Sequence, residues 1–113
     1  MRFCKALAFA TTALFVGTAA CYAADAEHGR DLAKRWCAAC HVVSPDQARA
    51  NADAPPFVTI ARSPNFDAKR LAYFLLDPHP KMPDLPLSRA AAEDVAAYIE
   101  TLRAEARNAL PPA

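Results

Sequence analysis

Two cysteines and a histidine at close spacing are the residues of this sequence best suited to chemistry. They form the segment Cys37-Ala38-Ala39-Cys40-His41. In a C-x-x-C-H pattern the two thiols lie on one side of a helical turn, at a separation suited to the two vinyl groups of one haem. The imidazole that follows is carried to where it can bind the iron. The segment therefore predicts one covalently attached haem c per chain, with His41 as an axial ligand.

Two other kinds of site use the same residue types. A thioredoxin-like dithiol would need a βαβ context, and no strand pattern of useful length occurs in this sequence. A tetrahedral zinc site would need two further thiolate or imidazole ligands at tight spacing. The remaining cysteines, Cys4 and Cys21, lie in the N-terminal segment. Covalent haem is the interpretation that we carry forward.

The first 23 residues have the three parts of a secretory signal. Two basic residues come first, residues 6–16 are uncharged, and small residues follow. Cleavage after Ala23 would place Cys21 and Ala23 at the third and first positions before the cut. An uncleaved anchor and a lipid-modified Cys21 are the alternatives. We expect cleavage, export of the remaining chain to the periplasm and no stable membrane insertion afterwards.

The mature chain is predicted to be all-α, with three main helices. Glycine occurs twice and proline ten times, which favours helices joined by proline-rich loops over a turn-rich β-sandwich. The helices are expected at about 26–38, from a cap at Asp67 to Asp77, and from a cap at Ser88 to about 107, with a short helical turn near 57–61. We assign residues 24–107 to one domain and 108–113 to a flexible tail.

The composition limits both the core and the partners. Of the 113 residues, 28 are alanine, so the large apolar side chains are few and a haem would fill the middle of the fold. The formal net charge is +1, which gives no electrostatic case for nucleic acid as a partner. We expect a monomer.

The sequence also predicts where the aromatic side chains beside the helical faces lie. Trp36, beside the C-x-x-C-H segment, is expected to pack between helices rather than on the haem. Phe74 keeps the apolar period of its helix with Leu71 and Leu75, so it is expected to face inward. Tyr73 is then expected at the rim.

The sixth iron ligand must come from elsewhere in the chain. Met82 is the one methionine after the predicted signal, and it lies in Pro80-Lys81-Met82-Pro83. A soft thioether suits low-spin haem iron, and the flanking prolines would hold it with little loop entropy left to lose. His79, three residues earlier, is a competing ligand.

The order of these features resembles the small soluble class I cytochromes c of bacteria. The C-x-x-C-H segment follows an amphipathic helix, a methionine-proline loop comes next, and a helix with Val95, Tyr98, Ile99 and Leu102 comes last. The resemblance covers about residues 27–102. It implies the cytochrome c fold, with helices and proline-rich loops around one covalently bound haem.

The resemblance also implies roles for particular residues. Met82 becomes the expected axial ligand opposite His41. Gly29 in the first helix is expected to pack against Tyr98 in the last. The backbone carbonyl of Pro55, or alternatively of Pro56, is expected to accept a hydrogen bond from the haem histidine and so fix its ring.

A haem with both axial positions filled has no open site for a substrate, so it can only pass electrons. We therefore predict a periplasmic electron carrier of a respiratory chain and no enzymatic activity. A dehydrogenase or quinol-oxidising complex would be the donor and an oxidase or reductase the acceptor. The alternatives are the dedicated electron-accepting subunit of one periplasmic dehydrogenase, or a haem-based ligand sensor if Met82 is displaced.

Overall fold

The computed structural model describes residues 22–50, 53–77 and 81–109, and this part contains helices and loops but no β-strand. The predicted signal, except for its last two residues, therefore lies outside the described residues, as do His79 and the last four residues. None of the helices in the described part is long and apolar enough to cross a membrane.

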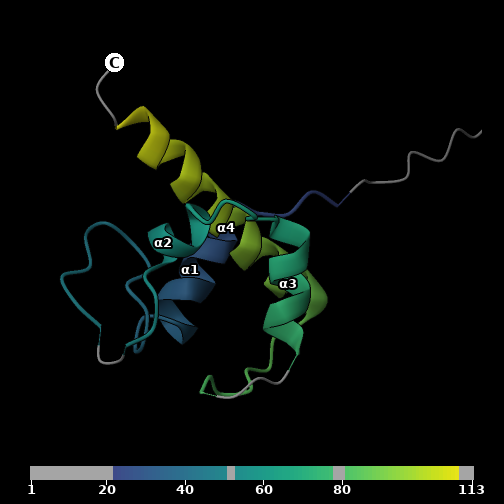
Figure 1. Cartoon of the computed structure of the whole chain (residues 1–113). Helices are drawn as coiled ribbons and strands as arrows, with labels where there is room; N and C mark the ends of the chain where they lie inside the picture. Colours follow the sequence, from purple (N-terminus) through teal and green to yellow (C-terminus); the bar gives the residue numbers. More distant parts are fainter. Residues whose placement is uncertain (1–21, 51–52, 78–80, 110–113) are drawn as a thin grey trace, which may run out of the picture.

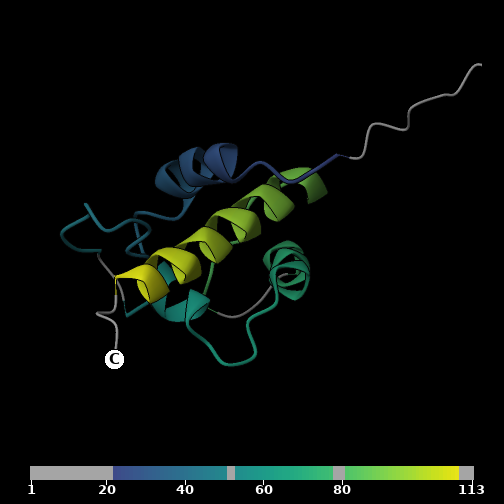
Figure 2. The ribbon, with the colours of Figure 1, turned by 90° about the horizontal axis from the view of Figure 1, so that it is seen from above.

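The described residues form four helices, and α4 is at their centre. They are α1 (Ala26–Trp36), α2 (Phe57–Ala61), α3 (Ala68–Leu76) and α4 (Arg89–Asn108). The long α4 contacts each of the other three. In Figure 1 α1 and α3 lie on either side of its first half, and Figure 2 shows α1 running beside it. The all-α prediction is confirmed.

Local signals set the helix boundaries much as the sequence predicted. The Asp67 carboxylate accepts from the Arg70 N–H at 2.8 Å, and the Ser88 hydroxyl accepts from the Ala91 N–H at 3.1 Å. Each satisfies a backbone donor that the first helical turn leaves without a partner. The short helix α2 has the predicted bounds. Helix α1 ends two residues earlier than predicted, at Trp36, because Cys37 turns the chain into the next loop.

The core lies between α4 and its neighbours. All four residues of the predicted apolar face of α4, Val95, Tyr98, Ile99 and Leu102, are buried. They pack with Ala33, Cys37, Val43, Phe57 and Ala61. A second, smaller cluster of alanines joins α3 to α4.

Two details of the predicted packing were wrong. Trp36 is 42% exposed, because the buried stripe of α1 runs through Gly29, Ala33 and Cys37 at steps of four residues, one position away from Trp36. Phe74 is 52% exposed for the same reason, since Ala72 is the buried residue of α3. Tyr73 is exposed, as expected for the rim.

Gly29 packs closely against the backbone of α4. A Cβ at this position would overlap the carbonyl of Asp94 and would lie 2.9 Å from the Val95 nitrogen. The nearest α4 atoms thus belong to the backbone of Asp94 and Val95, about one helical turn before Tyr98. Only a glycine lets the two helix backbones approach this closely.

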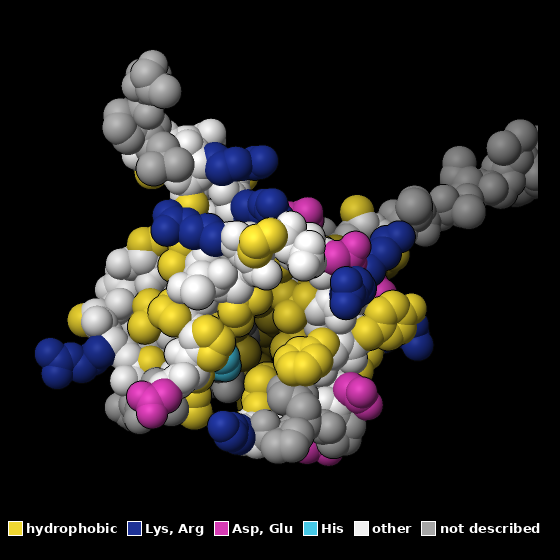
Figure 3. All heavy atoms as spheres, viewed as in Figure 1, with side chains coloured by type: hydrophobic (Ala, Val, Ile, Leu, Met, Phe, Trp, Pro, Cys, Tyr) yellow, Lys and Arg dark blue, Asp and Glu magenta, His cyan; other side chains and the backbone are white. Residues whose placement is uncertain are grey.

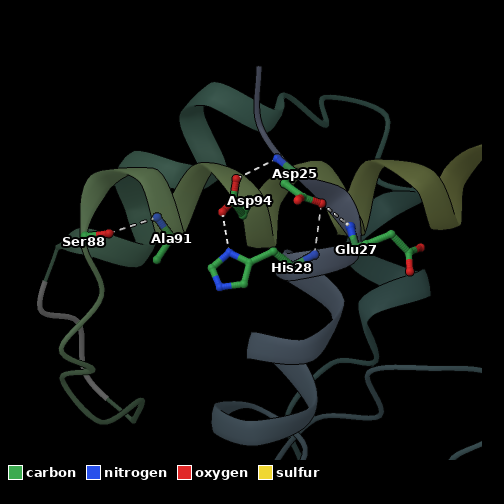
Figure 4. A network of polar contacts seen from close by, with 6 residues as sticks. All are labelled: Asp25, Glu27, His28, Ser88, Ala91 and Asp94. Carbon is green, nitrogen blue, oxygen red and sulfur yellow. Dashed lines mark hydrogen bonds and ion pairs between the residues drawn. The ribbon is translucent and has the colours of Figure 1, made fainter. Parts of the chain in front are cut away.

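A polar cluster ties the start of α1 to α4, as Figure 4 shows. The buried carboxylate of Asp94 accepts from the Asp25 N–H at 2.7 Å and lies 2.7 Å from His28 Nδ1. Asp25 in turn caps α1 by accepting from the N–H groups of Glu27 and His28. One buried carboxylate therefore has two partners from the neighbouring helix.

Candidate functional site

The C-x-x-C-H segment forms a tight turn at the end of α1. Cys37 caps the helix, with its N–H donating to the Ala33 carbonyl at 2.9 Å. The Cys37 carbonyl then accepts from the N–H groups of Cys40 at 3.1 Å and His41 at 2.8 Å. These backbone bonds fold the segment that carries Cys37, Cys40 and His41 into one turn.

The two thiols differ in environment. Both are free, with Cys37 buried and Cys40 exposed. Burial, and to a lesser extent the neighbouring Cys40, raises the pKa of Cys37 to about 11. Cys37 is therefore a neutral thiol at pH 7.

His41 is held by its ring as well as by its backbone. Its Nδ1 lies 2.7 Å from the carbonyl oxygen of Pro55, so the predicted contact is present. A carbonyl can only accept, hence Nδ1 carries the proton and the lone pair of the neutral ring is on Nε2. The ring also lies 5.3 Å from the Phe57 ring, tilted by 53°. This imidazole has the tautomer that a metal ligand needs.

The loop that follows His41 is closed at its base. The Phe57 N–H donates to the Val42 carbonyl at 2.9 Å, and the buried Tyr98 hydroxyl donates to the Val43 carbonyl at 2.7 Å. Burial is the main cause that raises the pKa of Tyr98. These bonds hold Pro55 beside His41 although 14 residues separate them in the chain.

Sequence reasoning missed one residue in this loop. Gln47 makes four side-chain hydrogen bonds to the backbone, two of them to residues of the C-x-x-C-H segment. It lies in a polar stretch without periodicity, and such a stretch offers no signal that separates a hub of hydrogen bonds from an ordinary loop residue.

Met82 lies in the segment between α3 and α4 and is half-buried. The preceding residue, Lys81, has φ of 77°. A non-glycine residue rarely adopts this left-handed conformation, and such conformations are concentrated at functional sites. The pairing of Met82 with His41 at the iron stays a prediction.

The residues that the structure brings together fit a haem. Figure 3 shows a hollow, between α1 and α2 on one side and α3 on the other, with hydrophobic side chains around it and a histidine inside. Two free thiols can bond to the vinyl groups of a haem, and an imidazole with its lone pair on Nε2 can ligate its iron. A separate cavity of about 300 Å³, between the Val42–Pro45 segment and the second half of α4, contains none of these donors.

The zinc alternative finds no support in the structure. Within the described residues, no three His, Cys, Asp or Glu side chains are grouped closely enough to hold a metal ion. A structural zinc ion needs four such ligands.

Comparison with known proteins gives one informative match. The chain is 65% identical over 81 residues to cytochrome c-552 of Bradyrhizobium diazoefficiens, which covers 72% of this chain and 78% of that protein. No family model matches the chain, and no solved structure matches it.

Proposed function

The chain belongs to the c-type cytochromes and is an electron carrier with covalently bound haem c; we propose that Cys37 and Cys40 attach the haem and that His41 and Met82 ligate its iron in the periplasm. The haem supplies a centre that is oxidised and reduced by one electron. The residues of the chain would bind the haem, supply the axial ligands of its iron and keep other ligands from binding.

The observation that carries the proposal is the bond between His41 and Pro55. At 2.7 Å it fixes the Nδ1 proton and orients the ring, so Nε2 is available to the iron. A carbonyl acceptor also makes the imidazole a stronger donor. The ring and both thiols come from one turn, in which the Cys37 carbonyl accepts from the N–H groups of Cys40 and His41.

Met82 is proposed as the second axial ligand. The left-handed Lys81 turns the chain immediately before it, and Pro83 restricts the chain immediately after it. A thioether held this way would close the last coordination position, so that neither substrate nor gas could bind. The similarity to cytochrome c-552 likewise does not favour a ligand sensor or a dedicated dehydrogenase subunit.

Location and processing are part of the same proposal. Residues 1–23 would be removed as a signal, residues 24–107 would form the domain and residues 108–113 a flexible tail. Residues 22–24 are exposed and precede α1, so a peptidase could reach them. The partners would be redox proteins, a dehydrogenase or quinol-oxidising complex as donor and an oxidase or reductase as acceptor, in encounters with a monomer.

The test of the ligand set uses four variants of the full chain, expressed with the c-type haem assembly machinery. His41→Ala should lose the low-spin spectrum, and His28→Ala is its control because the latter histidine pairs with Asp94. Met82→Ala should lose the ferric near-red band of methionine-ligated haem, and Leu85→Ala, in the same segment, should keep it. An unchanged spectrum for His41→Ala or Met82→Ala would contradict the assignment of that ligand.

The test of location is cell fractionation with mass analysis of the purified protein. We expect the protein in the periplasmic fraction, with a mass that corresponds to a chain beginning at Ala24 plus one haem. A cytoplasmic protein that keeps residues 1–23 would contradict export.

A further inference from the structure

The side-chain amide of Gln47 is bonded on both sides to the backbone around the C-x-x-C-H segment. Its Oε1 accepts from the Val43 N–H at 2.9 Å. Its Nε2 donates to the carbonyls of Ala38 at 3.1 Å and His41 at 3.0 Å. A third carbonyl, that of Arg49, lies 3.3 Å from Nε2. A half-buried side chain thus satisfies four backbone groups that no regular secondary structure would pair.

The hydrogen-bond partners determine the positions of the oxygen and the nitrogen in the Gln47 amide. An N–H group needs an acceptor, and carbonyl groups need a donor, so only one orientation of the Gln47 amide satisfies Val43, Ala38 and His41 together. The two shorter Nε2 bonds use both of its hydrogens. Among the uncharged side chains of similar length, no other has an acceptor and a two-hydrogen donor at its tip.

The chain folds back so that Gln47 can reach the segment. The Gln47 N–H donates to the Ser44 carbonyl at 3.1 Å, which closes a turn. Within this turn a hydrogen bond from Ser44 lowers the pKa of Asp46, so the carboxylate form is favoured. The Val43 carbonyl, at the other end, is bound by the Tyr98 hydroxyl. This bond attaches the turn to α4 and so keeps Gln47 beside the C-x-x-C-H segment.

His41 is then held at three points. Its N–H donates to the Cys37 carbonyl, its ring donates to the Pro55 carbonyl, and its own carbonyl accepts from Gln47 Nε2. The first two bonds fix the helical turn and the ring. The third fixes the peptide plane that follows His41, and with it the direction in which the chain leaves the segment.

We propose that Gln47 is a positioning residue for the haem ligand: its amide holds the backbone at Ala38 and His41, so that the imidazole keeps one orientation toward the iron. It touches neither iron nor haem in this role. This inference rests on the proposed ligation by His41. Because a ligand held in one orientation needs its supports to be fixed as well, removing the amide should loosen the ring although Pro55 stays in place.

The test compares Gln47→Ala and Gln47→Glu with two controls in the matured holoprotein. Gln47→Glu keeps an oxygen that can accept from the Val43 N–H. It replaces Nε2 with a second oxygen, which cannot donate to the three carbonyls. Ala48→Glu adds the same charge one residue later, on an exposed side chain. His28→Ala weakens the protein at the opposite end of α1, and so controls for a loss of stability alone.

Two readouts report on the ring of His41. The first is the exchange rate of its Nδ1 proton in the ferrous protein by NMR, relative to the amide proton of Ile99 in the core. The second is the pattern of haem-methyl shifts in the ferric protein, which depends on the plane of the axial imidazole. We expect both Gln47 variants to exchange the Nδ1 proton faster by on the order of tenfold, and to change the methyl pattern. Both controls should match the native protein.

Native exchange and an unchanged methyl pattern in the Gln47 variants would overturn the inference, as would equal changes in the controls. A native ferric protein whose His41 ring protons show no paramagnetic shift would overturn the proposed ligation itself, and this inference with it. The second result concerns the unmutated protein, so the two failures are distinguishable.

Discussion

Replacing Gly29 with alanine tests how closely α1 and α4 must approach. The added Cβ would overlap the Asp94 carbonyl and lie 2.9 Å from the Val95 nitrogen. Both are backbone atoms of a buried stretch of helix, so no flexible side chain can move aside. The two helices would have to separate, which also strains the bonds from Asp94 to Asp25 and His28.

The expected cost follows from two opposing effects. Overpacking a well-packed interface costs about 1–3 kcal/mol, occasionally more, and a clash with backbone belongs at the upper end. Alanine gains about 1 kcal/mol over glycine as a helix former. The net loss in the free energy of unfolding is therefore about 2 kcal/mol, which is a large fraction of the stability of a domain of this size.

The assay is guanidinium unfolding of the holoprotein, followed by circular dichroism and by the haem absorbance. The matched control is the pair Asp31→Gly and Asp31→Ala on the exposed face of α1, where alanine should be the more stable by about 1 kcal/mol. If Gly29→Ala gains stability in the same way, the close approach of α1 and α4 is not a requirement of the fold and the reasoning is refuted.

Three further changes have expected outcomes. Cys40→Ala should leave at most one thioether, so covalent haem content on a denaturing gel should fall sharply, and normal content would contradict the attachment. His28→Ala should lower the free energy of unfolding by roughly 1–2 kcal/mol, because the buried Asp94 loses a partner; an unchanged guanidinium midpoint would contradict this. Tyr98→Phe should cost about 1–3 kcal/mol at pH 7, because the buried Val43 carbonyl loses its donor. The raised pKa of Tyr98 means that the stability given by the neutral phenol is complete below pH about 10 and is lost as the pH rises through the folded value, so the difference between Tyr98→Phe and the native ferrous protein should shrink at high pH. A difference independent of pH would contradict that shift.

The helices were predictable because their signals are local. Asp67 and Ser88 cap helices by bonds to residues only three positions away. The buried face of α4 was predictable because a long helix that packs on three others repeats its apolar residues over several turns. The C-x-x-C-H segment needs only five consecutive residues to specify its chemistry.

The errors arose where the burial stripe is short or rests on alanine and glycine. In α1 and α3 the buried residues include Gly29, Ala33 and Ala72, which carry little hydrophobic signal, while the large Trp36 and Phe74 are half exposed. A prediction based on the spacing of large apolar side chains therefore selects a helix face next to the one that is buried. In addition, a haem would fill part of the core, so fewer large side chains need to be buried against other parts of the protein.

Contacts between distant residues could be predicted only where the family resemblance supplied them. Pro55 was assigned in this way, with Pro56 as the alternative, and the structure shows the contact with Pro55. The ties from Gln47 to His41 and from Asp94 to His28 depend on how a loop folds back and how two helices cross. Neither arrangement is encoded in a short spacing along the chain.

We propose that His41 and Met82 together leave no open coordination position on a covalently bound haem. The most direct measurement is the visible and near-red spectrum of the matured protein, ferric and ferrous, before and after carbon monoxide. We expect sharp low-spin ferrous bands, a weak ferric near-red band from methionine ligation and no response to carbon monoxide. Absence of the near-red band together with prompt carbon monoxide binding would contradict it.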